Sequence, residues 1–282
     1  MPPRGKSTRM SSVRKVKSSR QFDSSLLQKL FNAKRTQLRM MMDRGFSIGA
    51  ESRVLEMTLY DFQEYYRQLS ASTGRTFRAS MGASYQRELT GGEELDPDKY
   101  AVRARVTVVF ADTEQGKTQI GKPIVNEIVG SLRDQGVDHI MIITELPLSP
   151  EAKSSIASLP SLFIESFTYE DIGYVPVDNF LVSKHTLLSP QQRASFLRGW
   201  PEVLDLNTPT KIKPAQLPEI NITDIIARYY GARLGDIFLV ERPDLLGSSV
   251  QDVTVSYRCV TNRKLPAAKA SSTKTSMDIM DV

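Results

Sequence analysis

The chain has 282 residues, 40% of them hydrophobic and 24% charged, which is an ordinary globular composition with room for two modest domains. A single cysteine, Cys259, excludes an intrachain disulfide and sites built from several thiolates, and two histidines leave little for a histidine-based metal site. No apolar run approaches the about 20 residues that a membrane span needs, and the N-terminus lacks the apolar core of a signal peptide, so we expect no membrane association.

The net charge of +5 comes from the two ends of the chain, because the residues between them carry more acids than bases. We expect disordered tails at residues 1–22, which are basic and rich in serine, and at residues 263–282. The basic tail is either a solvated segment or an arm that contacts phosphates or serves nuclear targeting. A stand-alone DNA-binding module carried by this arm is therefore one functional hypothesis.

Two helices are predicted at the start of the first unit. An apolar stripe with three-four spacing begins after Asp23, and Gly45 is expected to end that helix in a left-handed conformation. The stripe consists of Leu27, Leu30, Phe31, Lys34, Leu38, Met41 and Met42. The second helix begins at Thr58, which forms a capping box with Asp61. The polar, glycine-rich residues 71–98 are predicted to form a loop or an insertion.

Strands and helices then alternate. Strands are predicted at 102–110, 139–143 and 162–167, with helices that begin at Pro123 and Ser149 and a helix end at Gly136. Short connections between these elements favour parallel pairing in a small α/β layer.

A second, α+β unit follows a boundary that we place at residues 174–184. It is predicted to contain a helix from a Ser189-Pro190 capping box to Gly199, a loop at 205–218, a short helix from Thr223 to Gly231, and strands at 237–241 and 253–260. The predicted fold is thus an α/β N-terminal domain of residues 23–173 followed by a compact α+β C-terminal domain of residues 174–262.

Residues 111–118 fit a loose form of the phosphate-binding loop, and a nucleotide-binding enzyme is the hypothesis that this pattern supports. The physical match is poor. Asp112 and Glu114 would direct negative charge at the phosphates, and Gly121 and Pro123 interrupt the helix that should follow Lys117 directly. We therefore interpret the pattern as a coincidence.

No other group of residues has the spacing of a catalytic or metal site, so we expect no catalytic residue, cofactor, metal or small-molecule substrate. His139 lies in an apolar strand and is interpreted as a core residue with a satisfied side chain. His185 lies at the predicted domain joint.

Several short motifs carry a resemblance to a known family. They are Asp43-Arg44-Gly45-Phe46, Met57-Thr58-Leu59, His185-Thr-Leu-Leu-Ser189-Pro190, Leu217-Pro218-Glu219-Ile220, Ala227-Arg228-Tyr229-Tyr230-Gly231, Leu234-Gly235-Asp236, Arg242-Pro243 and Ser256-Tyr257-Arg258. Over about residues 23–262 the chain resembles the fifth subunit of eukaryotic nuclear RNA polymerases, whose C-terminal domain corresponds to a separate small subunit of the archaeal polymerase.

The chain departs from this family at several positions. Ser183 replaces a proline, Asp224-Ile225 replaces an Asp-Pro pair, and residues 244–250 differ from the usual stretch after Arg-Pro. Residues 71–98 and 205–216 and both tails look like additions. These departures suggest a divergent lineage, a class-specific paralogue or a copy from a large DNA virus, and the choice of polymerase class stays open.

The resemblance implies a non-catalytic structural subunit of a multisubunit DNA-directed RNA polymerase. Its N-terminal domain would be a jaw beside downstream duplex DNA, and its C-terminal assembly domain would dock on the largest subunit. A nuclear location is implied, or a viral factory or virion in the cytoplasm if the protein is virus-encoded.

The resemblance also implies which residues make these contacts. The DNA-facing loop would be Ser149, Pro150, Glu151, Ala152 and Lys153. The candidates for docking on the largest subunit are His185, Arg228, Tyr229, Tyr230, Gly231, Gly235, Asp236, Arg242, Tyr257 and Arg258. Of the two adjacent tyrosines, we expect one to point inward and one outward.

Overall fold

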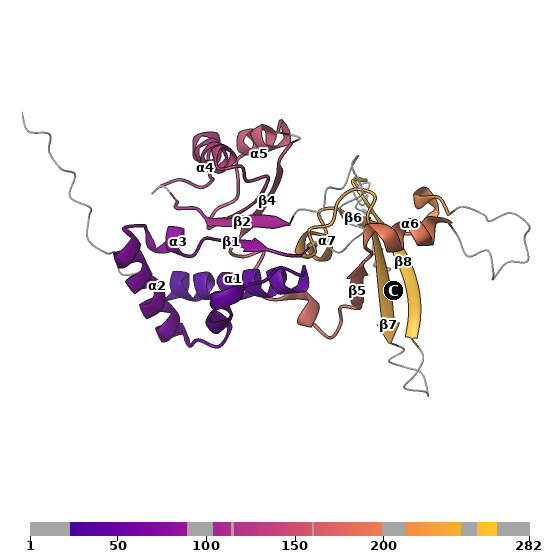
Figure 1. Ribbon diagram of the computed structural model, residues 1–282, viewed down its shortest axis with the longest axis horizontal. Coiled ribbons are helices and arrows are strands. Elements are labelled where there is room, and N and C mark those ends of the chain that lie inside the picture. Colours follow the sequence, from indigo (N-terminus) through magenta and orange to yellow (C-terminus); the bar gives the residue numbers. More distant parts are fainter. Residues whose placement is uncertain are drawn as a thin grey trace, which may run out of the picture.

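The computed structural model describes residues 23–88, 104–113, 116–159, 161–198, 212–243 and 253–263. Two sheets organise these residues, and Figure 1 shows the second sheet beside the first, with α7 between them. Helices α1 and α2 lie on one face of the first sheet, and α4 and α5 lie on the other. The predicted tails fall outside the described residues except for Arg263.

The first sheet has four strands in the order β1-β2-β3-β4, with bounds Ala83–Gln86, Arg105–Phe110, His139–Thr144 and Phe163–Thr168. β2 pairs parallel with β3, and β3 pairs parallel with β4, as the strand-helix alternation predicted. β1 pairs antiparallel with β2. The parallel α/β layer is therefore confirmed.

The predicted loop at 71–98 is wrong in its first half. Helix α2 (Leu59–Thr73) extends into it, and α3 (Phe77–Ser80) and β1 follow; residues 89–98 lie outside the described residues. α3 and β1 have four residues each, too few to show a periodic pattern. β1 is held by its pairing with β2, a tertiary contact that local sequence does not reveal.

Alternating residues of the strands divide the first unit into two cores. Val106, Val108 and Phe110 of β2 pack in the core with α1 (Ser24–Asp43) and α2. Ile140 and Ile142 of β3 face the opposite core, which α4 (Lys122–Asp134) and α5 (Pro150–Ala157) cover. The sheet is therefore buried on both faces, as its continuous apolar β3 strand requires.

The predicted helix ends agree with the structure. Thr58 and Asp61 form the capping box of α2, and Gly45 and Gly136 adopt positive φ angles of 82° and 74° after α1 and α4. In the predicted stripe of α1, however, Met42 is 45% exposed, because it lies at the helix end where the core no longer covers it.

Lys34 lies in the same stripe and is fully buried. Its ammonium donates to the carbonyl of Met81 at 2.8 Å, to the hydroxyl of Tyr85 at 3.0 Å and to Glu51 at 3.1 Å. Burial lowers the pKa of Lys34, and the neighbouring Glu51 partly opposes that shift. The three-four spacing thus predicted correctly that Lys34 lies in the core, where three oxygens accept hydrogen bonds from its ammonium group.

The second sheet has the order β5-β7-β8-β6, with bounds Lys184–Leu187, Ile237–Pro243, Val253–Thr261 and Glu219–Asn221. β7 pairs antiparallel with β5 and β8, and β6 pairs parallel with β8. β7 and β8 agree with prediction. The short β5 and β6 were not predicted, since strands of four and three residues leave no pattern to detect.

Two short helices complete this unit, and three 3-10 turns complete the described chain. Helix α6 (Pro190–Arg198) begins with the predicted capping box of Ser189 and Gln192, whereas Gly199 lies outside the described residues. Helix α7 (Ile225–Tyr229) is capped by Asp224, not by Thr223, because the Asp224 carboxylate accepts from the amide of Ile226. The 3-10 turns are η1 (Gly49–Leu55), η2 (Pro176–Asp178) and η3 (Pro214–Gln216).

Candidate functional site

The two units meet at the side chain of Arg44, which follows the last turn of α1. Its guanidinium forms two hydrogen bonds of 2.8 Å each with the carboxylate of Glu165 on β4. It also donates to the carbonyl of Arg228 at 2.7 Å and to that of Tyr229 at 2.8 Å, at the end of α7. The Arg44 and Glu165 side chains are 5% and 10% exposed. One buried guanidinium therefore joins α1, β4 and α7.

The end of α7 is suited to receive this cation. The last carbonyls of a helix have no partner within it and carry partial negative charge. Gly231, which follows, has a φ of 65°, and a β-carbon there would lie 2.9 Å from an Arg44 guanidinium nitrogen. A glycine is thus required both by the backbone turn and by the space that Arg44 occupies.

Glu165 has a second partner in His139 on β3. The imidazole Nε2 lies 2.8 Å from the carboxylate, so the prediction of a satisfied core histidine is confirmed. Burial alone would raise the pKa of Glu165, but Arg44 and the His139 hydrogen bond together lower it to about 2. Burial lowers the pKa of His139, which favours a neutral ring that donates from Nε2.

The side chains of Arg228 and Tyr229 also make contacts with other residues of the same chain. Tyr229 is 1% exposed, packs in the core of the N-terminal unit, and donates its hydroxyl to Asp43 at 2.6 Å. Arg228 donates to the Ser166 carbonyl at 2.8 Å and pairs with Asp171 at 3.2 Å. These two candidates for docking on another subunit therefore hold the chain's own two units together.

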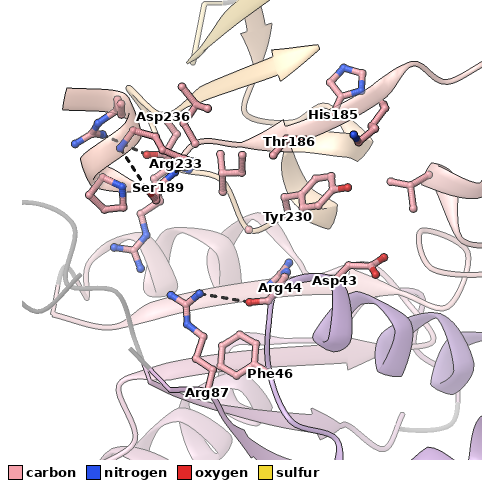
Figure 2. Close-up of a pocket in the computed structure, with 18 of the residues that line it drawn as sticks. Asp43, Arg44, Phe46, Arg87, His185, Thr186, Ser189, Tyr230, Arg233 and Asp236 are labelled. Atoms are coloured by element: carbon pink, nitrogen blue, oxygen red, sulfur yellow. Dashed lines mark hydrogen bonds and ion pairs between the residues drawn. The ribbon is translucent and has the colours of Figure 1, made fainter. Parts of the chain in front are cut away.

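A cleft of about 620 Å³ lies between the units and is lined from both sides (Figure 2). The guanidinium of Arg87 lies over the ring of Phe46 at 5.4 Å, and that of Arg233 lies over the ring of Phe163 at 4.3 Å. Tyr230 also lines the cleft. It is half-buried, whereas Tyr229 is buried, which agrees with the expectation of one inward and one more outward ring.

Gly235 and Asp236 have local structural roles. The amide of Gly235, whose φ is 87°, donates to the carbonyl of Val260, and the Asp236 carboxylate accepts from the amide of Arg233 and pairs with Arg193 at 3.4 Å. These contacts fix the corner that leads from α7 into β7.

The remaining docking candidates lie on the strands of the second sheet. By the register of β5, β7 and β8, His185, Arg242 and Arg258 project from one face of the sheet, and Tyr257 projects from the other. Tyr257 stacks on Phe196 of α6 with the ring centres 4.1 Å apart. Arg242 is exposed, and no described residue forms an ion pair or hydrogen bond with it or with Arg258.

The predicted DNA-facing loop begins α5, and Ser149 caps that helix by accepting from the amide of Ala152 at 3.2 Å. Hydrogen bonds between residue 120 and residues 147 and 149 hold this loop against the start of α4. Two helix N-termini therefore lie side by side, with Lys117 and Lys122 exposed next to them. Ala152 is fully buried, so its side chain is not part of any surface that this loop presents.

Lys153 is exposed on the other side of α5, where it lines a cleft of about 530 Å³ with residues that include Phe163 of β4 and Arg228 of α7. The cation that the resemblance assigns to DNA thus faces away from Lys117 and Lys122.

The described residues of the phosphate-loop pattern, 111–113 and 116–118, do not have the geometry of a phosphate-binding loop. The helix after them begins only at Lys122, with Gly121 as its N-cap, and the Asp112 carboxylate accepts from the hydroxyl of Thr76. A phosphate-binding loop leads from its lysine directly into a helix whose N-terminus faces the phosphates. The interpretation of this pattern as a coincidence agrees with the structure.

Within the described ranges, no cluster of three or more histidine, cysteine, aspartate or glutamate side chains has the arrangement of a metal site. None of the helices in that part of the chain is both long enough and apolar enough to cross a membrane.

Comparison with protein families gives two matches. Residues 24–128 match the model of the RNA polymerase Rpb5 N-terminal domain, and residues 176–260 match that of the RNA polymerase Rpb5 C-terminal domain. Together the two matches span more than half of the chain and include residues from both sheets.

Among similar proteins is DNA-directed RNA polymerases I, II, and III subunit RPABC1 of Caenorhabditis briggsae, 25% identical over 243 residues that cover 82% of this chain and 95% of that protein. The Dictyostelium discoideum subunit rpabc1 is 30% identical over 142 residues, covering 49% of this chain and 64% of that protein. DNA-directed RNA polymerases IV and V subunit 5B of Arabidopsis thaliana is 23% identical over 241 residues, which cover 83% of this chain and 90% of that protein. The chain belongs to the Rpb5 family of RNA polymerase subunits.

Proposed function

We propose that this protein is a non-catalytic structural subunit of a multisubunit DNA-directed RNA polymerase, anchored to the largest subunit and placing its N-terminal unit beside downstream DNA. The observation that carries the proposal is the match of both Rpb5 domains, in order, to the two units of the chain. The relatives named above are polymerase subunits, and we extend that role to this chain. We expect it in the nucleus, or in a viral factory or virion if a virus encodes it.

A positional role needs a stiff connection between the part that docks and the part that meets DNA. The Arg44 junction supplies such a connection, because a buried, bidentate ion pair and two helix carbonyls fix α7 against β4. Movement at this point would leave the buried Glu165 carboxylate without its cation, which is strongly unfavourable. The docking of one unit would therefore set the direction of the other.

The surface available for docking is smaller than the motifs alone suggested. Arg228, Tyr229 and Gly231 serve the junction, and Gly235 and Asp236 shape a turn. We assign docking on the largest subunit to the candidates that remain on the faces of the second sheet and in the cleft beside it, namely His185, Tyr230, Arg242, Tyr257 and Arg258.

For the DNA contact we propose the loop at residues 149–153 together with the start of α4. Two neighbouring helix N-termini with the exposed cations Lys117 and Lys122 beside them, and the exposed Lys153 on the other side of α5, favour a phosphate backbone as the ligand. Glu151 lies in the same loop and opposes that attraction, so the contact is expected to be weak and dependent on salt.

Purification of the tagged full-length chain from its own cells or from infected cells, at moderate salt, tests the main proposal. We expect recovery of the two largest polymerase subunits in amounts similar to that of the tagged chain. A chain recovered alone, in folded form, would contradict the proposal. The Arg44→Ala chain is the matched control. It disrupts the junction but none of the residues assigned to docking, so its recovery of the polymerase subunits shows whether docking depends on the junction.

A further inference from the structure

We propose that the outer edge of β8 from Val253 to Tyr257 binds an extended segment of the largest polymerase subunit as an added β-strand. This inference rests on the proposed function, and it states how the second sheet binds the largest subunit. Figure 1 shows β8 on the side of its sheet that faces away from the N-terminal unit.

The backbone of β8 is paired along only part of one side. β7 pairs with β8 from Val253 to Cys259, but β6 pairs only with Cys259–Thr261. The amide of Cys259 donates to Pro218, next to β6, whereas the amide of Val260 donates to Asp236, next to β7. Backbone groups in a strand alternate between its two sides.

It follows that residues 253, 255 and 257 direct their N–H and C=O groups to the outer edge, where no described residue pairs with them. The other residues of this stretch, Thr254 and Ser256, direct theirs to β7. Sheet edges in native proteins are usually guarded by lysine, proline, a bulge or a covering segment. The stretch from Val253 to Tyr257 contains neither lysine nor proline.

The side chains along this edge indicate what the added strand carries. On one face, Val253 and Val255 are 51% and 53% exposed, beyond the stacked pair of Tyr257 and Phe196. On the other face, Arg258 projects from β8 and Arg242 from its neighbour β7, with no described partner for either cation. Apolar groups on one face and unpaired cations on the other are complementary to a strand that alternates apolar and acidic residues.

This arrangement favours a protein strand over nucleic acid. A phosphate backbone would be met by the arginines but would leave two exposed valines and the row of unpaired backbone groups without suitable partners. An extended peptide suits the arginines, the valines and the unpaired backbone groups alike. Its backbone pairs with β8, and its alternate side chains reach the two faces.

Hydrogen exchange at single amides tests the proposal, because alternate residues of β8 direct their amides to different partners. In the free full-length chain, the amides of Val255 and Tyr257 should exchange rapidly, while those of Thr254 and Ser256 are protected by β7. In the polymerase recovered with the tagged chain, the exchange of Val255 and Tyr257 should slow by at least about tenfold, since each amide gains a backbone hydrogen bond.

Substitutions give a second readout. Val255→Pro removes an outward N–H and leaves the pairing with β7 intact, and Val255→Lys places a charge on the apolar face. Each should lower recovery of the largest subunit by about tenfold, the equivalent of about one backbone hydrogen bond. Thr254→Lys, on the other face where acidic side chains are expected, is the matched control and should retain recovery. Arg242→Glu combined with Arg258→Glu should lower it.

The outcomes separate this inference from the proposed function. If the polymerase is recovered but the Val255 and Tyr257 amides exchange as fast as in the free chain, the added strand is refuted and the subunit role stands. If the folded chain recovers no polymerase subunit, both fall. Slowed exchange at Val255 and Tyr257, with recovery lost in Val255→Pro and kept in Thr254→Lys, supports both.

Discussion

The Arg44 guanidinium holds the Glu165 carboxylate in a two-pronged hydrogen-bonded ion pair, although 121 residues separate them in the chain. Both prongs measure 2.8 Å, and the same guanidinium holds the last carbonyls of α7. The planar fork of arginine suits this geometry, because it can serve a carboxylate and two carbonyls at once. This one side chain thus joins the two units, together with the contacts of Arg228 and Tyr229.

Replacing Arg44 by alanine is expected to destabilise the protein strongly. The change leaves Glu165 buried without its cation and the Tyr229 carbonyl without its side-chain donor, which in comparable sites costs about 3–5 kcal/mol. Arg44→Lys should recover only part of this loss, since one ammonium cannot reproduce the bidentate pair. The free energy of unfolding in urea measures both effects.

Arg39→Ala is the matched control for this prediction. Arg39 forms an ion pair with Asp43 four residues later, at 3.2 Å, but its side chain is 48% exposed. Solvent screens such a pair, so its removal should change stability by no more than about 0.5 kcal/mol. Equal effects of Arg44→Ala and Arg39→Ala would show that the buried junction has no special importance.

Gly231→Ala should disturb the same junction from the other side. Its β-carbon would meet the Arg44 guanidinium at 2.9 Å, and its φ of 65° is strained for alanine. Gly136→Ala is the control, because Gly136 has a similar φ of 74° and nothing within 4 Å of the added carbon. The free energy of unfolding lost in Gly231→Ala should exceed that lost in Gly136→Ala by about 2 kcal/mol, the value of a hydrogen bond to a charged group.

A double-mutant cycle checks the cause of this difference. In an Arg44→Ala background the space beside Gly231 is open, so Gly231→Ala should cost no more than Gly136→Ala. An excess loss that persists without Arg44 would mean that contact with the guanidinium is not what makes glycine necessary at this position.

Acid should weaken the junction through Glu165. Its pKa is about 2 in the folded protein and near 4.5 when unperturbed. A carboxyl group with a lowered folded pKa stabilises the protein above its unfolded pKa, and this stability is lost as pH falls toward the folded value. From pH 6 to pH 3 the protein should lose on the order of 2 kcal/mol through this group.

The Glu165→Gln variant isolates the contribution. Its stability should fall less than that of the wild type between pH 6 and pH 3, as measured by urea unfolding at each pH. His139 acts in the same direction, because its lowered pKa makes protonation on unfolding favourable in acid. The comparison is therefore repeated in a His139→Gln background, and identical pH profiles of both chains there would refute the assignment to Glu165.

The periodic elements of the fold were predictable because their signals are local. The alternation of β2, the apolar run of β3, the capping boxes at Thr58 and Ser189 and the glycine at the end of α1 each lie within a few residues. Elements of three or four residues, such as β1, β5 and β6, were missed because tertiary pairing rather than sequence pattern stabilises them.

The junction itself could not be predicted, because it joins residues that are far apart in the chain. Asp43 and Arg44 were noted only as part of a motif that resembles the family, and Glu165 was not singled out. One signal was present: Glu165 is an acid within a predicted strand of a parallel layer, and a charge that such a layer buries needs a partner. The identity of that partner required the fold.

The loop at Ser149 gives the last prediction, on contact with DNA. If the starts of α4 and α5 contact the duplex, Lys122→Ala and Lys153→Ala should each weaken DNA retention by the assembled polymerase. Removing one phosphate contact lowers the slope of log affinity against log salt by about one. Because Lys122 and Lys153 lie on opposite sides of α5, their separate effects would show which side the duplex follows.

Lys213→Ala is the control for charge alone, since Lys213 is also exposed but belongs to the second unit. It should leave the salt slope unchanged. Ser149→Ala is unsuitable as a first test, because loss of the helix cap costs about 1 kcal/mol and would mix stability with binding. If Lys122→Ala and Lys153→Ala both bind DNA with the wild-type slope, the helix starts do not touch the phosphate backbone, and the N-terminal unit then acts only through its protein contacts.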